Sequence, residues 1–373
     1  MNTPDYTIQY RNSDLGQTGL FFYNSAPDLA ALYPSESVAA TGRFFVTDTA
    51  VAALPCMKDF ISRFTLSGDT GCRNKDLLLV ITAGETYKTI DTVLRIAKTA
   101  LEHNLGRKSL FVAIGGGVVS DLTAFAASIF KRGAGLEIVP TTLLAMADAA
   151  VGGKTGCDFG AYKNMLGTFY PARRIHFYPA FLRTLPEGEY RSGLAEALKT
   201  GLLFNAGLFD LFKAGKKKLF ENESAMIRAC VMAKAKIVEE DVTEEGPRML
   251  LNFGHTFAHA LESVVGLGKV SHGDAVAWGM GRALDLSVRL GLCAPAYRDE
   301  VYAVLAAYGW ETGPVHPALA AQITDMPAVL IEAMKKDKKN SSEKIRVILQ
   351  KGLSDTVIQE VAEDRIRVVL AGG

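Results

Sequence analysis

Apolar runs that end in aspartate, glycine or threonine alternate with helical stretches through the first half of this chain. The runs cover residues 42–48, 76–84, 109–117 and 135–142, and the stretches 86–105 and 121–130 have helical spacing. In the stretch 86–105, the apolar residues on one side are Val93, Leu94, Ile96, Ala97 and Leu101. Nearly continuous apolar strands separated by amphipathic helices are typical of a parallel sheet covered on both faces. The sequence therefore predicts an α/β N-terminal domain with a parallel, Rossmann-like sheet.

The second half changes character, because the pattern after residues 184–190 is almost wholly helical. Pro186 and Gly188 mark a boundary. A chain of 373 residues is too long for one ordinary core. We expect two domains, residues 1–183 with the parallel sheet and residues 184–373 as a mainly helical, all-α C-terminal domain.

Composition excludes several classes of partner. The formal net charge is +1, so no global field attracts nucleic acid or an anionic membrane. Five scattered cysteines, none in a CxxC pair, argue for a reducing compartment and against a disulfide framework. The N-terminus lacks the layout of a signal peptide, and no apolar run approaches the roughly 18 residues of a membrane span. We expect a cytoplasmic protein.

Ligands of parallel sheets bind at the carboxyl ends of strands, where Asp48, Gly115–Gly117 and Thr141–Thr142 fall. The glycine run opens a helix, so its backbone N–H groups could hold a pyrophosphate. Read as G-x-G-x-x-G, the run has Ser120 in the third glycine position, and no acidic residue clearly ends the next strand. The pattern alone leaves dinucleotide binding and a plain tight turn equally open.

A second glycine-rich segment, residues 152–167, carries Lys154, Lys163 and Asn164. Glycines allow close backbone approach, and lysine and asparagine supply charge and donors for an anion. The spacing is not that of a Walker A loop. Residues 131–133, 234–236, Arg248 and 334–340 add cations, although most lysines of such a chain are merely solvated.

Histidines and a glutamate in helical, apolar surroundings indicate a metal site. His255, His259 and His272 account for three of the six histidines, and Glu196 lies in a similar setting upstream. One carboxylate and two imidazoles make an open divalent-metal site. The segment HTFAH lacks the glutamate of a zinc-peptidase HExxH motif. Spacing leaves open which two of the three histidines ligate.

At this point the chain resembles the 3-dehydroquinate synthase family. The matching strings run from about Asp48 to about Asn340 and include GGGVVSD, TTLLAMADAAVGGKT, GLAEALKTG, NFGHTFAHALE and HGDAVAWGM. The resemblance implies a dehydroquinate synthase-like fold and a lyase of the shikimate pathway that uses catalytic NAD and one zinc or cobalt ion. Its substrate would be 3-deoxy-arabino-heptulosonate 7-phosphate, and its products 3-dehydroquinate and phosphate. Transient oxidation, phosphate elimination, re-reduction and an intramolecular aldol step would follow one another.

The resemblance also implies roles for individual residues. The metal ligands would be Glu196, His255 and His272. The catalytic residues would be Asp148, Lys154, Lys199, Asn252 and His259. The substrate would be bound by Arg132, Lys154, Asn164, Lys234, Arg248, Asn252, His259 and Lys338. The NAD contacts would be Asp48, Glu85, Lys88, Gly116, Gly117, Val118, Asp121, Thr141, Thr142, Lys163, Thr184 and Glu189. Arg132 would reach the phosphate pocket of a partner subunit, which implies a homodimer.

The chain departs from the family pattern at Ser120, Ala50 and Asp274, and none of these removes a metal ligand or a phosphate cation. Three alternatives remain, and one of them, a non-catalytic metal- or nucleotide-binding relative, is disfavoured because no proposed catalytic position is visibly lost. Another sugar-phosphate cyclase, making a valiolone or a deoxy-inosose, would take a substrate without a carboxylate, and the joint presence of Lys234, Arg248 and Asn252 argues against it. A metal-dependent polyol dehydrogenase would share the architecture but not the strings quoted above.

Overall fold

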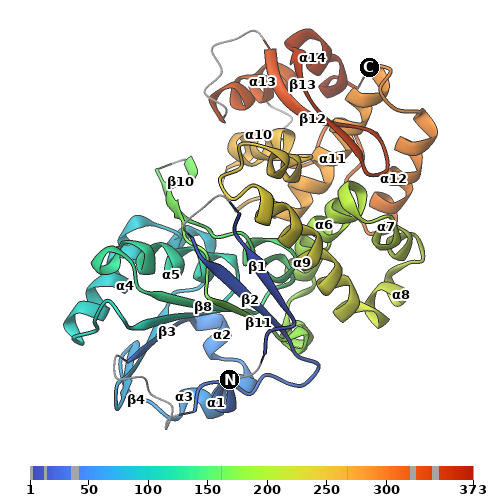
Figure 1. Ribbon diagram of the computed structural model, residues 1–373. Coiled ribbons are helices and arrows are strands. Elements are labelled where there is room, and N and C mark those ends of the chain that lie inside the picture. The colour runs from blue at the N-terminus through green and yellow to red at the C-terminus, as the bar shows by residue number, and fades with distance from the viewer. Residues whose placement is uncertain are drawn as a thin grey trace. The chain divides into compact units, whose positions relative to one another are not determined.

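The computed structural model describes residues 3–11, 15–34, 42–160, 162–266, 268–319, 325–337 and 344–372. The chain forms two compact units (Figure 1). Unit 1 comprises Met1–Pro186 and Lys234–Thr243, and unit 2 comprises Glu187–Ala233 and Glu244–Gly373. The division at residues 183/184 stays a prediction, and the units differ from it because a short later segment belongs to unit 1.

Unit 1 is built on a nine-stranded sheet in the order β1-β2-β11-β8-β7-β3-β6-β5-β4. The strands are β1 Tyr6–Gln9, β2 Gln17–Phe22, β3 Arg43–Asp48, β4 Thr65–Ser67, β5 Thr70–Arg73, β6 Asp76–Ile81, β7 Leu110–Gly115, β8 Gly135–Pro140 and β11 Arg174–Phe177. From β2 to β6 all neighbours are parallel, whereas β1, β5 and β4 pair antiparallel at the two edges. Every residue of β8 is buried, as expected for a strand covered on both faces. The predicted parallel sheet is confirmed.

Short helices and two long ones connect these strands. They are α1 Leu29–Leu32, α2 Thr49–Ala52, η2 Pro55–Met57, α3 Lys58–Ile61, η3 Glu85–Tyr87, α4 Ile90–Glu102, α5 Gly117–Ile129, η4 Phe130–Arg132, η5 Ala145–Ala149 and η6 Pro179–Thr184. The expected apolar side of α4 is only partly buried. Val93 and Ile96 are in the core, but Leu94 and Leu101 are 53% and 54% exposed, because they lie outside the arc that faces the sheet.

The glycine-rich segment forms an antiparallel hairpin of β9 Lys154–Phe159 and β10 Tyr162–Phe169. Glycine is required where the strands meet, because a Cβ atom on Gly167 would lie 1.9 Å from the carbonyl oxygen of Thr155. Helix α5 packs on β7 and also on β9. The hairpin therefore lies over the helix that follows the first glycine run.

The segment Lys234–Thr243 is tied to the first strand of the sheet. Glu239 accepts hydrogen bonds from the Tyr6 hydroxyl at 3.0 Å and from the Gln9 backbone N–H at 3.2 Å. Its carbonyl oxygen accepts from the Arg11 N–H at 3.0 Å. These bonds satisfy backbone groups along an otherwise open sheet edge.

Unit 2 is mainly helical. Its elements are α6 Glu187–Phe204, α7 Ala206–Lys213, α8 Lys216–Glu221, α9 Glu223–Glu240, η7 Pro247–Asn252, α10 His255–Val265, α11 His272–Arg289, α12 Pro295–Ala307, α13 Met326–Asp337, β12 Lys344–Gly352, β13 Asp355–Ala362 and α14 Glu363–Leu370. The last residues of α9, from Lys234 on, belong to unit 1. Helix α11 is central, because it packs on α6, α10 and α12.

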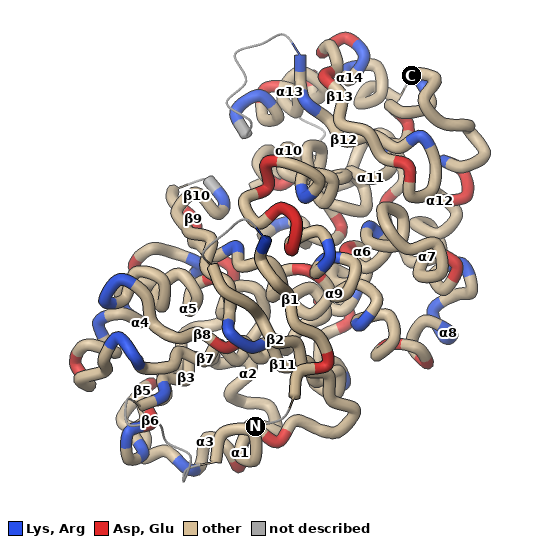
Figure 2. Tube along the Cα trace, viewed as in Figure 1, with Lys and Arg blue, Asp and Glu red and all other residues tan. Residues whose placement is uncertain are grey.

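The expectation of a wholly α-helical second half is wrong in one place, because β12 and β13 pair as an antiparallel hairpin. Residues 347–350 of β12 are all buried, so this strand is covered on both faces in its middle. Lys and Arg residues are interspersed with Asp and Glu in both units, in keeping with the small net charge (Figure 2). Among the described helices, none has the length and hydropathy needed to cross a bilayer.

Candidate active site

Three side chains from three helices of unit 2 converge on one point. Glu196 lies within α6, His255 is the first residue of α10, and His272 is the first residue of α11. Each offers a ligand atom, and these atoms all lie within 4.8 Å of one another. Oε1 of Glu196 lies 3.6 Å from Nε2 of His255 and 3.3 Å from Nε2 of His272.

These separations fit a metal ion. With metal–ligand bonds of about 2.0–2.2 Å, ligand atoms at a tetrahedral ion lie about 3.3–3.6 Å apart. Two imidazoles and one carboxylate also match the donor set of an open zinc site, with a remaining position for substrate. The donor set and its spacing can therefore hold one divalent ion.

The two histidines of the cluster differ in protonation. Burial lowers the pKa of His255 well below its usual value, and the Lys199 ammonium lowers it further, so this ring is neutral at pH 7. Burial acts on His272 in the same direction, but its contacts with Glu196 and Glu262 prevail and raise its pKa to about 9. His255 is therefore already in the neutral form that binds metal, whereas His272 has to release a proton when an ion binds, so metal binding should weaken as the pH falls.

Glycines and caps set the positions of both histidines. Gly254 has φ +82° directly before His255, and a Cβ atom there would lie 2.9 Å from the backbone nitrogen of Met280 in α11. Before His272, the Ser271 side chain caps α11 by accepting from the Asp274 N–H. The N–H of Gly273 donates to the hydroxyl of Ser192 in α6 at 3.0 Å. Close helix packing thus places both rings beside Glu196.

Of the other predicted residues of unit 2, Lys199 and His259 lie at this cluster. Arg248 and Asn252 lie on η7, which comes before α10 in the chain. Lys199 forms an ion pair with Glu196, and both are buried. The ring of His259 lies 5.4 Å from that of His255 between centroids. Asn252, at the end of η7, donates through Nδ2 to Oε1 of Glu244. Arg248, on the same short helix, is fully buried.

In unit 1, the predicted NAD contacts gather at the carboxyl ends of three adjacent strands. Asp48 ends β3, Gly116 follows β7, and Thr141 follows β8. The backbone N–H of Thr141 donates to the carbonyl oxygen of Gly115 at 2.9 Å. Gly116 is the N-cap of α5 and provides no side-chain cap, so the first N–H groups of α5 can meet an anion. The hydroxyl of Thr141 is buried without a hydrogen-bond partner in the described part of the chain. These groups fit a dinucleotide phosphate.

A buried lysine joins residues of two predicted sites. Nζ of Lys88 lies 2.7 Å from Asp121 in α5 and donates to Oδ1 of Asn164 in β10 at 2.6 Å. Burial lowers the pKa of Lys88, but the carboxylates of Asp121 and Glu85 outweigh it, so the pKa is raised and the ammonium stays charged. The resemblance implies that Lys88 and Asp121 contact NAD and that Asn164 binds the substrate phosphate. The contacts of Lys88 with the other two residues fix the relative positions of these three side chains.

A second ion pair links Asp148 and Lys234. Oδ1 of Asp148 lies 2.7 Å from Nζ of Lys234, which also donates to the Asp148 carbonyl at 2.8 Å. Asp148 lies in η5, a single π-helical turn of a kind frequent at functional sites. The pair brings a predicted catalytic residue and a predicted substrate ligand together within unit 1.

The remaining predicted residues are not among those that form the metal cluster, the Lys88 network or the Asp148–Lys234 pair. Lys154 begins β9, Lys163 lies on β10, and Gly117 and Val118 lie in the first turn of α5. Thr142, which follows β8, lies close to Gly116. Arg132, Thr184 and Glu189 are exposed and join none of the clusters above. Lys338 lies outside the described residues.

Two family models together match most of the chain. The model described as 3-dehydroquinate synthase N-terminal matches residues 78–192, and the model described as 3-dehydroquinate synthase C-terminal matches residues 193–340. The chain belongs to the 3-dehydroquinate synthase family. It is 39% identical to the 3-dehydroquinate synthase of Crocosphaera subtropica over 75% of this chain and 77% of that one. It is 41% identical to the Acidithiobacillus ferrooxidans enzyme over 76% of each.

A solved structure supports the fold of this family member. The 2-epi-5-epi-valiolone synthase of Streptomyces hygroscopicus, determined with NAD+ and Zn2+ bound, matches with a TM-score of 0.81. It is 28% identical and covers 95% of this chain and 96% of that one. The resemblance found in the sequence is confirmed, whereas the roles of individual residues stay predictions.

Sequence reasoning overlooked two carboxylates beside the family's predicted site. Glu244 bonds Asn252 and has φ +64°, which is a strained backbone region for glutamate. Glu262 lies 3.5 Å from Nδ1 of His272. A signal for Glu262 existed, because it follows His255 by two helical turns on the same face. Asp274, a departure from the family pattern, is ion-paired with Arg191 at 3.0 Å.

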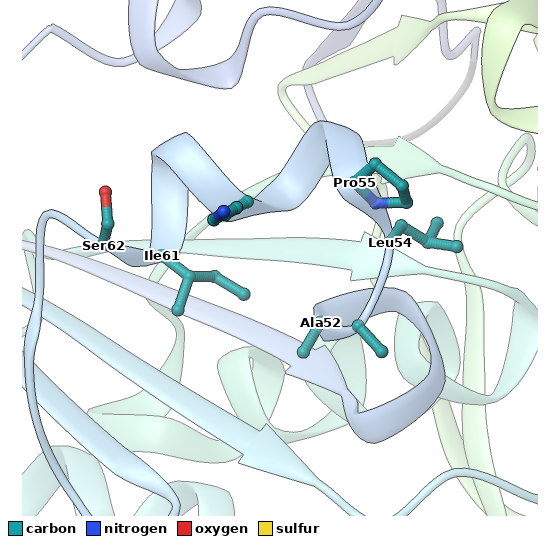
Figure 3. Close-up of a pocket in the computed structure, with 7 residues that line it drawn as sticks. Ala52, Leu54, Pro55, Ile61 and Ser62 are labelled. Atoms are coloured by element: carbon teal, nitrogen blue, oxygen red, sulfur yellow. The ribbon is translucent and has the colours of Figure 1, made fainter.

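One hollow in unit 1 does not coincide with this chemistry. A cavity of about 350 Å³ lies over α2, η2 and α3 and is lined by Ala52, Leu54, Pro55, Ile61, Ser62 and their neighbours (Figure 3). Lys58 is the only charged residue in its lining, so it offers no metal ligand. Polar side chains that converge, rather than this apolar hollow, mark the candidate site.

Proposed function

We propose that this protein converts 3-deoxy-arabino-heptulosonate 7-phosphate to 3-dehydroquinate and phosphate, with NAD and one zinc or cobalt ion. The observation that supports this best is the convergence of Glu196, His255 and His272 at metal-binding distances. Family membership supplies the reaction, and the valiolone synthase structure supplies precedent for NAD+ and Zn2+ on this fold.

The division of labour follows from the residues. When bound, the metal would supply Lewis-acid polarisation of a substrate hydroxyl, and NAD would supply a reversible acceptor for the hydride on its carbon. Glu196, His255 and His272 hold the metal, and Lys199 offsets the charge of the buried carboxylate. Fixed ligands and charges need no reorganisation during the reaction, so they stabilise developing charge efficiently.

Phosphate departure calls for cations and donors that hold a dianion in place. On the basis of the resemblance, we assign this task to Lys154, Asn164, His259 and Lys338. The Lys88–Asn164 bond fixes the side chain of Asn164, which reduces the rotamer entropy lost on binding. Positioning of this kind contributes several kcal/mol to catalysis without further acid–base groups.

The substrate carboxylate distinguishes this reaction from those of sister cyclases. We assign its recognition to Lys234 and Arg248, with Asn252 at a neighbouring hydroxyl. Lys234 is held by Asp148 at 2.7 Å, and Arg248 is fully buried. Cationic side chains held in place bind a carboxylate by charge-assisted hydrogen bonds, and a sugar phosphate without the carboxylate would lose these bonds.

The test is a phosphate-release assay with a panel of substrates. We expect release from 3-deoxy-arabino-heptulosonate 7-phosphate and none from glucose 6-phosphate or sedoheptulose 7-phosphate. The opposite preference would reject the proposal in favour of another cyclase. Steady accumulation of NADH with glycerol would instead indicate a polyol dehydrogenase, because the proposed reaction returns its hydride within each turnover.

We also propose a homodimer in which Arg132 serves the phosphate pocket of the partner subunit. Arg132 is exposed and has φ +66°, in a turn that Lys131 anchors by donating to the Leu105 carbonyl at 2.7 Å. Ile129 of α5 and Leu101 of α4 are 42% and 54% exposed, and these helices pack on each other. Exposed apolar side chains near the turn support a protein interface there.

Mixed dimers test this arrangement. Arg132→Ala and Lys154→Ala should each be nearly inactive alone. Co-expressed, they should recover about a quarter of wild-type activity, because half of the dimers are mixed and each has one intact site. The readout is phosphate release by the co-expressed mixture, and affinity-purified heterodimers should show about half of wild-type activity. Heterodimers as inactive as their parents would show that Arg132 does not act across the interface.

A further inference from the structure

The two histidines of the candidate metal site differ in what holds the far nitrogen of each ring. Nδ1 of His255 lies 3.2 Å from the backbone carbonyl of Phe253. Nδ1 of His272 lies 3.5 Å from Oε1 of Glu262, while its Nε2 lies 3.3 Å from Glu196. One ring is therefore held by the main chain, and the other stands between two carboxylates.

Glu262 reaches His272 through the packing of two helices. It lies on α10, two turns after His255 and on the same face, and α10 packs on α11. Glu262 is 4% exposed. Burying a carboxylate costs several kcal/mol unless a charge or donor compensates it, and the His272 ring provides such a partner.

We propose that Glu262 is a positioning residue that holds His272 for metal binding. Its carboxylate accepts the Nδ1–H of His272, which fixes the ring with Nε2 on the side of Glu196, where Nε2 can bind a metal ion once it has released its proton. Carboxylates behind ligating histidines set the tautomer and raise the basicity of the ligand. Glu262 itself touches neither metal nor substrate. The inference rests on the proposed metal-dependent function.

The experiment measures metal binding by the full chain. Zinc affinity is determined by competition with a chromophoric chelator, and the visible spectrum of the cobalt-substituted protein reports ligand geometry. Glu262→Gln keeps the shape of the side chain, and should weaken zinc binding by about 10- to 100-fold and alter the cobalt spectrum. Glu262→Ala should weaken it further.

A matched control separates positioning from general destabilisation. Glu223 is another buried glutamate of unit 2, 3% exposed, and it accepts from the Tyr190 hydroxyl at 2.9 Å. Glu223→Gln should leave zinc affinity and the cobalt spectrum unchanged. Equal weakening by Glu223→Gln, or wild-type affinity and spectrum in Glu262→Gln, would overturn the role of Glu262. A wild-type chain that binds no zinc would overturn the proposed function itself.

Discussion

His272→Ala is expected to abolish metal binding and to lower kcat/KM by about three orders of magnitude, on the order of 4 kcal/mol of transition-state stabilisation. The physical reason is that Nε2 of His272 lies 3.3 Å from Glu196, within the cluster of ligand atoms that Glu196, His255 and His272 form. Without it, only one imidazole and one carboxylate remain to hold the ion. Metal content by mass spectrometry and phosphate release by steady-state assay check the two effects together.

His316→Ala is the matched control for this substitution. His316 is also buried in unit 2, where its ring lies 6.1 Å from that of Trp278 and Nδ1 accepts from the Ala318 N–H. Its removal should lower stability but leave the metal in place. A His272→Ala protein with full metal stoichiometry would exclude His272 as a ligand. In a separate experiment, addition of zinc or cobalt should restore the activity of the chelator-treated wild-type protein but not that of the variant.

Gly273→Ala is expected to destabilise unit 2 by about 3 kcal/mol or more and to weaken metal binding at least tenfold. A Cβ atom at this position would lie 2.3 Å from both Cα and the carbonyl oxygen of Ser192. Both are backbone atoms and cannot rotate away, so α11 must separate from α6. His272 begins α11 and Glu196 lies one turn after Ser192, so the same movement pulls two metal ligands apart.

The measurements are urea unfolding and zinc titration, with Gly188→Ala as the control. Gly188 lies near the start of α6, and a Cβ atom there would meet no heavy atom within 4 Å. Alanine should be neutral or stabilising by up to about 1 kcal/mol at such a helical position. Wild-type stability and zinc affinity in Gly273→Ala would show that the two helices are not held as closely as the structure indicates.

Much of the fold could be predicted because local pattern and tertiary burial agree. The runs that became β3, β6, β7 and β8 are apolar on both faces, and parallel strands in a covered sheet require this. Helix α4 shows where the agreement ends. Leu94 and Leu101 satisfy helical spacing but remain exposed, because a sheet covers only part of a helix surface. The hairpin β12–β13 was not predicted, because the second half of the chain was interpreted as helical throughout.

The sequence predicted the strand-end residues of unit 1 more specifically than the metal ligands of unit 2. Strand ends identified Asp48, Gly116 and Thr141, because parallel topology brings carboxyl ends to one edge. Spacing could not choose among three histidines, since that choice depends on how α6, α10 and α11 pack. Hydrogen bonds between residues distant in sequence, such as Lys88 with Asn164, carry no local signal at all.

The chain returns to unit 1 for ten residues before completing unit 2. Lys234 and Glu239 both lie in that returning segment, where one pairs with Asp148 and the other accepts hydrogen bonds from β1. A polypeptide truncated after Pro186 would therefore leave an acidic side chain and a strand edge without their partners. Unit 1 is consequently not formed by one continuous stretch of chain, and we expect residues 1–186 alone to be less stable than unit 1 of the full chain.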